Sequence, residues 1–112
     1  MYTAVQNASI EVVNKILNFV QQAGSDPSDS YAGITDDPER RLFAEHLVRK
    51  EDSGSYIYLP VPDKETADLV ESHLTDSVFG RMDGGPGGDT KGCFVYAYLK
   101  KPHTKPRGDP SR

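Results

Sequence analysis

The chain has 112 residues, with 13 Lys and Arg against 17 Asp and Glu and a formal net charge of −4. This length allows one domain, and the single cysteine excludes an intrachain disulfide scaffold. Three scattered histidines and one cysteine also exclude a structural zinc site. No basic signal-peptide region opens the chain and no apolar run approaches the roughly 20 residues of a membrane span, so we expect a cytoplasmic protein that does not contact membranes.

The charge is distributed unevenly along the chain. Residues 100–112 carry five Lys and Arg against one Asp, a net charge of +4, so residues 1–99 carry −8. This acidic part lacks the broad basic face of a strong duplex-DNA binder. The last segment has three prolines and no large apolar residue, which predicts a disordered basic tail behind a single domain of residues 1–99. Such a tail is either a solvated terminus or a contact for nucleic acid or an acidic partner.

The first half of the chain predicts two helices and a strand. Apolar residues at helical spacing predict an amphipathic helix over 9–23, with Ser9 as its N-cap. A short strand over 30–35 follows. Asp37 then caps a second helix, which Pro38 starts and which extends to about residue 50.

The second half predicts two further strands and a third helix. A β-branched and aromatic strand covers 55–59, and Asp63 caps a helix over 64–75. A glycine-rich loop over 80–92 leads into the last and most apolar strand, 93–99. This order of elements predicts an α+β domain in which three helices pack against a small antiparallel three-stranded sheet.

Two arginines lie in the first turns of the second predicted helix. A cation there opposes the helix dipole, so Arg40 and Arg41 are unusual choices for stability alone. Guanidinium groups bind phosphate oxygens bidentately, which suits a phosphate-binding site. The alternative for Arg41 is a surface ion pair with Glu45, four residues later on the same helix.

The segment around these arginines resembles the second half of the GIY-YIG endonuclease signature. In that family a Tyr-x-Gly strand end is followed by an arginine eight residues after the glycine and then by a histidine in the same helix. Tyr31 and Gly33 match the Tyr-x-Gly element, Arg41 lies eight residues beyond the glycine, and His46 follows. The resemblance implies catalytic roles for Tyr31, Arg41 and His46.

The third predicted helix resembles the family helix whose glutamate holds a divalent metal. The resemblance implies that Glu71 binds Mg²⁺ or Mn²⁺ and that the last helix precedes a Pro-Gly-Gly turn, which is also present here. The helical spacing separately places Glu71 on the same face as Ala67 and Leu74. A carboxylate on an inward face is costly unless it is hydrogen-bonded, paired or bound to a metal. The alternative is a side chain at the edge of that face that reaches solvent or an arginine.

Three features depart from the family pattern. The first half of the signature, Gly-Ile-Tyr on an upstream strand, is missing, and the window that should hold it, 18–20, lies inside the first predicted helix. No asparagine follows Glu71. His46 lies thirteen residues after Gly33, one more than the usual spacing, so its position on the helix is rotated.

Tyrosines alternate on two of the predicted strands, Tyr56 with Tyr58 and Tyr96 with Tyr98, so each pair shares one face of the sheet. They either pack in the core or offer an exposed surface for base stacking. The missing Gly-Ile-Tyr strand supplies the tyrosine that activates the attacking water in the family. If the fold is retained, the C-terminal strand replaces that strand and brings Tyr96 or Tyr98 into the site.

The glycine-rich loop has two interpretations. Successive backbone N–H groups can form an anion-binding nest, and a tight or flexible connection is the alternative. The candidate binding residues of this loop are Gly84, Gly85, Gly87 and Gly88.

The sequence therefore predicts a divergent GIY-YIG-like domain that acts on DNA or RNA by metal-dependent phosphodiester hydrolysis. Arg41 would stabilise the phosphoryl transition state and Tyr31 would position water, with Arg40 and Gly33 beside them. The alternative is a catalytically inactive module that binds nucleic acid, a nucleotide or a protein, such as a small inhibitor or accessory protein of a phage or mobile element. The acidic charge and the missing motifs favour the module, and the retained residues favour the nuclease.

Overall fold

A computed structural model of the chain describes residues 4–76, 80–84 and 94–104. The main elements follow in the order α1 (Ala4–Gln22), β1 (Ser30–Thr35), the π-helical segment η2 (Arg40–Glu45), β2 (Tyr56–Pro60), α2 (Lys64–Leu74), β3 (Asp83–Gly84) and β4 (Phe94–Leu99). Helices and strands that mix in this way confirm the predicted α+β class.

The four strands form one mixed sheet in the order β2-β4-β1-β3. The last strand, β4, lies between β1 and β2 and is antiparallel to both, whereas β3 pairs with β1 in parallel. The prediction of a purely antiparallel three-stranded sheet is therefore wrong. Its missing member, β3, has only two residues, and Gly84 has a φ of 135° that brings its backbone against Ala32. So short a strand inside a glycine-rich segment has no apolar alternation that could predict it.

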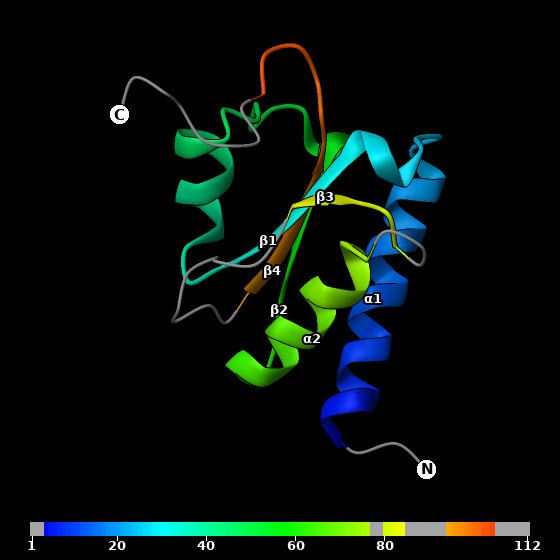
Figure 1. The fold of residues 1–112 in the computed structure, drawn as a ribbon. Helices are drawn as coiled ribbons and strands as arrows, with labels where there is room; N and C mark the ends of the chain where they lie inside the picture. Colours follow the sequence, from blue (N-terminus) through cyan, green and yellow to red (C-terminus); the bar gives the residue numbers. More distant parts are fainter. Residues whose placement is uncertain (1–3, 77–79, 85–93, 105–112) are drawn as a thin grey trace.

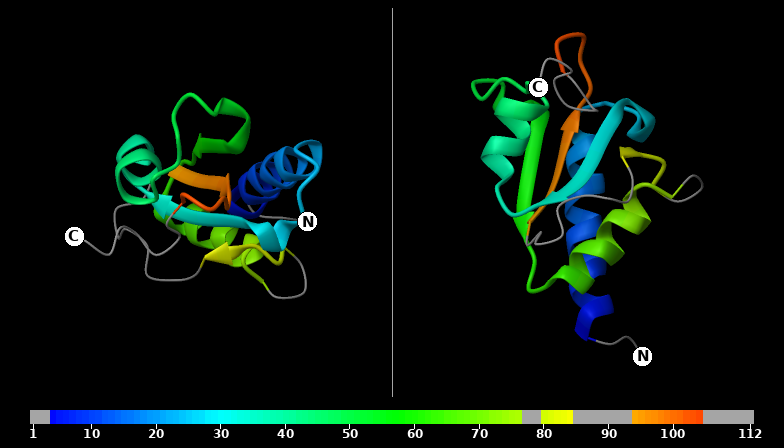
Figure 2. Two further views of the ribbon diagram at one scale, coloured as in Figure 1. Left: turned by 90° about the horizontal axis from the view of Figure 1, so that it is seen from above. Right: turned by 60° about the vertical axis from the view of Figure 1, so that its left-hand side comes forward.

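Helices cover both faces of the sheet (Figures 1 and 2). The helices α1 and α2 pack on one face, where alternate residues of β1 and β4 point toward them. The segment η2 covers the opposite face, which is rich in tyrosine. The core beneath α1 and α2 is built by buried aliphatic residues, among them Val13, Ile16, Val20, Ala32, Ile34, Val70, Leu74 and Val95.

Two predicted helix boundaries shift by several residues in the structure. The first helix starts at Ala4, so Ser9 is a buried residue inside α1 and not its N-cap. The second helix ends at Glu45, because Leu47 has a left-handed φ of 60° that stops further helical turns. The cap of α2 is confirmed, since the Asp63 carboxylate accepts a hydrogen bond from the backbone N–H of Thr66 at 2.8 Å.

The first residues of the predicted basic tail contact the domain. The backbone N–H of Lys100 donates to the carbonyl of Asp29 at 2.8 Å, and Lys101 Nζ pairs with the Asp52 carboxylate at 2.6 Å. Residues 105–112 lie outside the described residues, so disorder of the tail stays a prediction. Within the described ranges, no helix has the length and apolar character needed to cross a membrane.

The packing of α1 against the sheet leads to a stability prediction. Ile16 is fully buried, so Ile16→Ala removes packed methyl groups and leaves a cavity; we expect a loss of about 2–5 kcal/mol in the free energy of unfolding. Ile10 lies on the same helix with 41% of its surface exposed and is the matched control. Ile10→Ala should cost less than about 1 kcal/mol in the same urea unfolding experiment. Equal losses would show that α1 does not pack as described.

Candidate functional site

The site centres on a tyrosine that lies across a glycine. In the antiparallel pairing of β1 with β4, Gly33 lies opposite Tyr96. A Cβ atom on Gly33 would lie 2.5 Å from the Tyr96 hydroxyl oxygen and 2.6 Å from the ring carbon that carries it. No other residue leaves room for the phenol in this place, so the glycine of the Tyr-x-Gly element is required by close packing.

The hydroxyl of Tyr96 meets two side chains from the η2 region. Arg41 donates its Nε–H to the Tyr96 hydroxyl oxygen at 3.4 Å, and His46 Nε2 lies 2.7 Å from the same atom. The other ring nitrogen, His46 Nδ1, lies 3.1 Å from the hydroxyl of Tyr98. His46, Tyr96 and Tyr98 are at most 2% exposed, whereas the Arg41 side chain is 30% exposed. Arg41 is therefore the member of this cluster that reaches solvent.

Tyr31 packs its ring over the same cluster. Its ring centroid lies 4.8 Å from that of His46 and 5.4 Å from that of Tyr98. Tyr31 is half-buried, so it lies between the buried histidine and the surface. The structure thus brings together the predicted residues Tyr31, Gly33, Arg41 and His46. Tyr96 and Tyr98 join them from β4, the strand that the sequence analysis expected to bring one of these tyrosines to the site.

The π-helical turn of η2 explains how Arg41 and His46 both reach Tyr96. The backbone N–H of His46 donates to the carbonyl of Arg41 at 2.9 Å, a bond across five residues and not four. Residues five apart therefore lie on one face, and the extra residue before His46 is absorbed by the wider turn. Leu47 follows in the left-handed conformation, which costs a non-glycine residue about 1–2 kcal/mol. Strain of this kind persists where the surrounding packing fixes the backbone.

Glu45 joins the two arginines and was not predicted as part of the site. Its carboxylate forms ion pairs with Arg41 Nη1 and, at 3.5 Å, with Arg40 Nε. The expected pairing of Arg41 with Glu45 is confirmed, but Arg41 also contacts Tyr96, so the two interpretations of this arginine are compatible. The spacing of four residues was the sequence signal for this contact.

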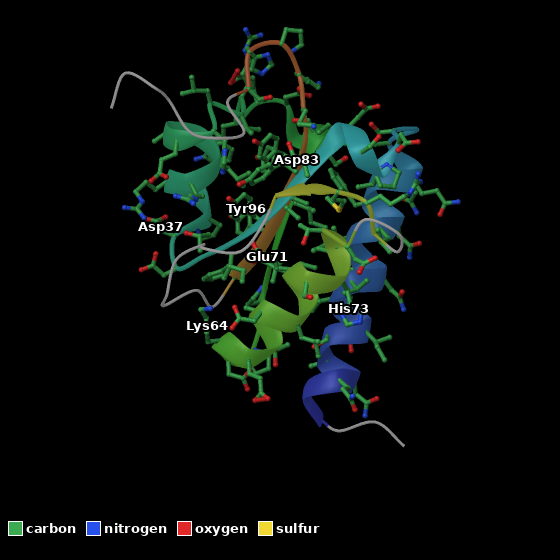
Figure 3. The ribbon with its side chains drawn as sticks, viewed as in Figure 1. Asp37, Lys64, Glu71, His73, Asp83 and Tyr96 are labelled. Carbon is green, nitrogen blue, oxygen red and sulfur yellow. The ribbon has the colours of Figure 1, made fainter. Side chains whose placement is uncertain are left out.

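Glu71 is a buried carboxylate on the inward face of α2. The residue is 6% exposed, and no hydrogen bond or ion pair of its carboxylate is found in the part of the chain that the structure describes. Burial raises the pKa of Glu71 to about 7; the charge of Asp68 adds to the rise, while Lys64 and Arg41 oppose it. Burial raises the pKa of Tyr96, and the charge of Glu71 adds a smaller rise. Glu71 projects from α2, whereas Tyr96 belongs to the face of the sheet that η2 covers (Figure 3).

Whether Glu71 could hold a cation depends on the groups around it. No group of three or more His, Cys, Asp or Glu side chains that could hold a metal ion occurs among the described residues. Mg²⁺, however, is commonly held by one or two carboxylates together with water and substrate phosphates. A buried carboxylate without a partner has the electrostatic need for a cation that such a site requires.

Other predicted site residues lie elsewhere. The Arg40 side chain is 53% exposed and pairs with Asp36 as well as Glu45. Gly84 belongs to β3, where it pairs with Ala32. Gly85, Gly87 and Gly88 lie outside the described residues, so the anion nest stays a prediction.

A comparison with known protein families, characterised proteins and solved structures finds no match for this chain. The GIY-YIG resemblance is therefore carried by the residues themselves and enters the functional argument only as a proposal.

The contact between Gly33 and Tyr96 leads to a prediction. Gly33→Ala forces the phenol to move, so we expect a loss of about 1–3 kcal/mol in unfolding free energy from overpacking. Gly54→Ala is the matched control, because no heavy atom lies within 4 Å of a Cβ built there. It should leave urea unfolding within about 0.5 kcal/mol of the wild type. A neutral Gly33→Ala would mean that Tyr96 does not lie across β1.

Proposed function

We propose that this chain is a GIY-YIG-like domain that acts on nucleic acid by metal-dependent phosphodiester hydrolysis. The observation that carries the proposal is the convergence of Arg41 and His46 on the Tyr96 hydroxyl, directly over the glycine of the Tyr-x-Gly element. In the GIY-YIG family, the Gly-Ile-Tyr strand supplies a second tyrosine to the site. Here that strand is missing, and Tyr96 of β4 is the second tyrosine. In this proposal β4 takes the place of that strand.

Arg41 is the phosphate-binding residue of the proposed site. Its guanidinium reaches solvent and carries a fixed positive charge, which stabilises the extra negative charge of a phosphoryl transition state. A phosphate oxygen would compete with the Glu45 carboxylate for Arg41 Nη1. Arg41 Nε would keep its contact with the Tyr96 hydroxyl while Nη1 exchanges the Glu45 carboxylate for a phosphate oxygen.

Tyr96 and His46 handle the proton in the proposed reaction. The short contact between them lets the hydroxyl proton move to the imidazole, and the positive charge of Arg41 stabilises the phenolate left behind. The phenolate can then accept a proton from the attacking water. Tyr31 packs over His46 and limits how much solvent reaches the pair.

Glu71 would hold the divalent cation, Mg²⁺ or Mn²⁺. When bound, that ion supplies Lewis-acid stabilisation of the phosphate oxygens. The role of Glu71 itself is to offer a carboxylate that burial has left without a partner.

A catalytically inactive binding module is the second candidate. The burial of Tyr96 and His46 favours it, because Tyr96 is only 1% exposed and its hydroxyl would reach water only if a neighbour moved. In this case Arg41 would bind an anionic ligand without chemistry, and the buried tyrosines would only support it.

A cleavage assay with matched variants tests the proposal. Wild-type protein is incubated with single-stranded, duplex and branched DNA and with RNA, in Mg²⁺ or Mn²⁺. We expect Glu71→Gln and Arg41→Ala to lower metal-dependent cleavage by roughly 100-fold or more, since each removes a charge from the transition state. Glu65→Gln and Arg49→Ala, which change exposed side chains outside the proposed site, should stay within a few-fold of the wild type.

Thermal unfolding in the same conditions measures metal binding independently of cleavage. Millimolar Mg²⁺ or Mn²⁺ should raise the melting temperature of the wild type but not of Glu71→Gln, because a ligand of the folded state stabilises it by mass action. A wild type that cleaves none of the substrates and shows no metal-dependent shift would refute the nuclease and leave the binding module.

The pKa of Glu71 leads to a prediction for the metal-free protein. The folded-state pKa of about 7 exceeds the ordinary 4.5, so the native carboxyl keeps its proton where the unfolded chain has lost it. The contribution of Glu71 to wild-type stability should therefore fall as pH rises from about 4.5 to 7. The amide side chain of Glu71→Gln does not titrate, so this variant does not lose stability in this way. Its free energy of unfolding relative to the wild type should increase from pH 5 to pH 8 by on the order of 1 kcal/mol.

Urea unfolding in EDTA at the two pH values measures this difference. Glu65→Gln, an exposed change on the same helix, should show a difference from the wild type that is the same at both. A pH-independent difference for Glu71→Gln would show that its carboxyl is well solvated.

A further inference from the structure

A buried histidine lies between two tyrosines in the candidate site. His46 Nε2 is 2.7 Å from the Tyr96 hydroxyl oxygen, and His46 Nδ1 is 3.1 Å from that of Tyr98. A neutral imidazole has one N–H and one lone pair, so it donates to one tyrosine and accepts from the other. The choice decides which ring nitrogen is able to take a proton.

The two distances favour one arrangement. Hydroxyl donors form bonds of about 2.7–2.8 Å, while N–H donors form bonds of about 2.9–3.0 Å. The 2.7 Å contact at Nε2 matches a Tyr96 hydroxyl that donates to a nitrogen lone pair. The 3.1 Å contact at Nδ1 matches an imidazole N–H that donates to Tyr98.

The charges around the tyrosines favour the same arrangement. Arg41 has only donors, so the bond from its Nε–H to Tyr96 leaves the Tyr96 hydrogen free to point at His46. Burial raises the pKa of both tyrosines, but Arg41 opposes the rise at Tyr96 through its hydrogen bond and its charge. At Tyr98 the charges of Tyr96, Tyr31 and Asp83 add to the rise. Arg41 acts on Tyr98 through its charge alone but on Tyr96 through a hydrogen bond as well, so the contact with Arg41 favours Tyr96 as the donor to His46.

We propose that Tyr98 is a positioning residue, which accepts a hydrogen bond from His46 Nδ1–H and thereby holds the Nε2 lone pair toward the Tyr96 hydroxyl. When the proton moves from Tyr96 to His46 Nε2, it leaves a phenolate beside Arg41 and an imidazolium. The two N–H groups of that imidazolium then donate to Tyr96 and Tyr98, and Tyr98 keeps its own proton. The catalytic use of this arrangement rests on the proposed function, but the tautomer of His46 does not.

Nuclear magnetic resonance of the full ¹⁵N-labelled chain tests the tautomer directly. Long-range ¹H–¹⁵N correlations near pH 7.5 distinguish protonated from unprotonated ring nitrogens, and the spectrum of His46→Gln identifies the His46 signals. We expect Nδ1 to carry the hydrogen in the wild type. Tyr98→Phe keeps the ring and removes the acceptor, so the hydrogen should move to Nε2, where Tyr96 can accept it.

Tyr56→Phe is the matched control. The Tyr56 hydroxyl donates to the backbone carbonyl of Lys50 at 3.0 Å, so its removal deletes a tyrosine hydroxyl of the same sheet face without contact to His46. It should leave the His46 tautomer unchanged. A wild type with the hydrogen on Nε2, or a Tyr98→Phe spectrum with the hydrogen still on Nδ1, overturns the proposal. The wild-type spectrum decides even if Tyr98→Phe does not fold.

Kinetics separate this inference from the proposed function. If the wild type cleaves nucleic acid, Tyr98→Phe should lower kcat at least about tenfold and leave KM within about twofold, because Tyr98 does not touch substrate. An unchanged kcat overturns the positioning role. If the wild type cleaves nothing, the nuclease is refuted while the spectra still decide the tautomer.

Discussion

The candidate site depends on the absence of a side chain at Gly33. Only there can the phenol of Tyr96 cross β1, because any Cβ would overlap its hydroxyl and ring. That crossing puts the Tyr96 hydroxyl within hydrogen-bond distance of His46 and Arg41, which come from the helix on the same face. The position of the Tyr96 hydroxyl thus depends both on the register of the sheet and on the packing of η2 against β4. A shift of either would separate this hydroxyl from His46 and Arg41.

A second constraint lies in the backbone of η2. A regular α-helix brings residues three and four apart to one face, whereas Arg41 and His46 are five apart. The wider π-helical turn brings these two residues to one face. Leu47, in the left-handed conformation, follows the end of the helix. Both features cost free energy locally. The aromatic packing of His46 beneath Tyr31 and beside Tyr98 offsets that cost.

Arg41 and Glu71 differ in whether they have a partner of opposite charge. Arg41 has a carboxylate partner in Glu45, whereas Glu71 is buried without one within the described residues. A structure selected only for stability would have little use for such a carboxylate, since burial disfavours its charged form. Arg41 lowers the pKa of Glu71 through its charge, and in the proposed function the two groups would bind a ligand that contributes both an anion and a cation. A metal-bound phosphate has this character.

Local patterns in the sequence determined the α+β class, both α-helices, three of the four strands, and the grouping of Tyr31, Gly33, Arg41 and His46 in one segment. These features follow from helical and strand periodicity, caps and short spacings, which act over a few residues. Only the tertiary structure decided that β4 pairs with β1 so that Tyr96 faces Gly33, that η2 turns as a π-helix, and that β3 joins the sheet. Strand pairing joins residues far apart in the chain, and the π-turn is held by contacts with another strand, so no local propensity encodes either.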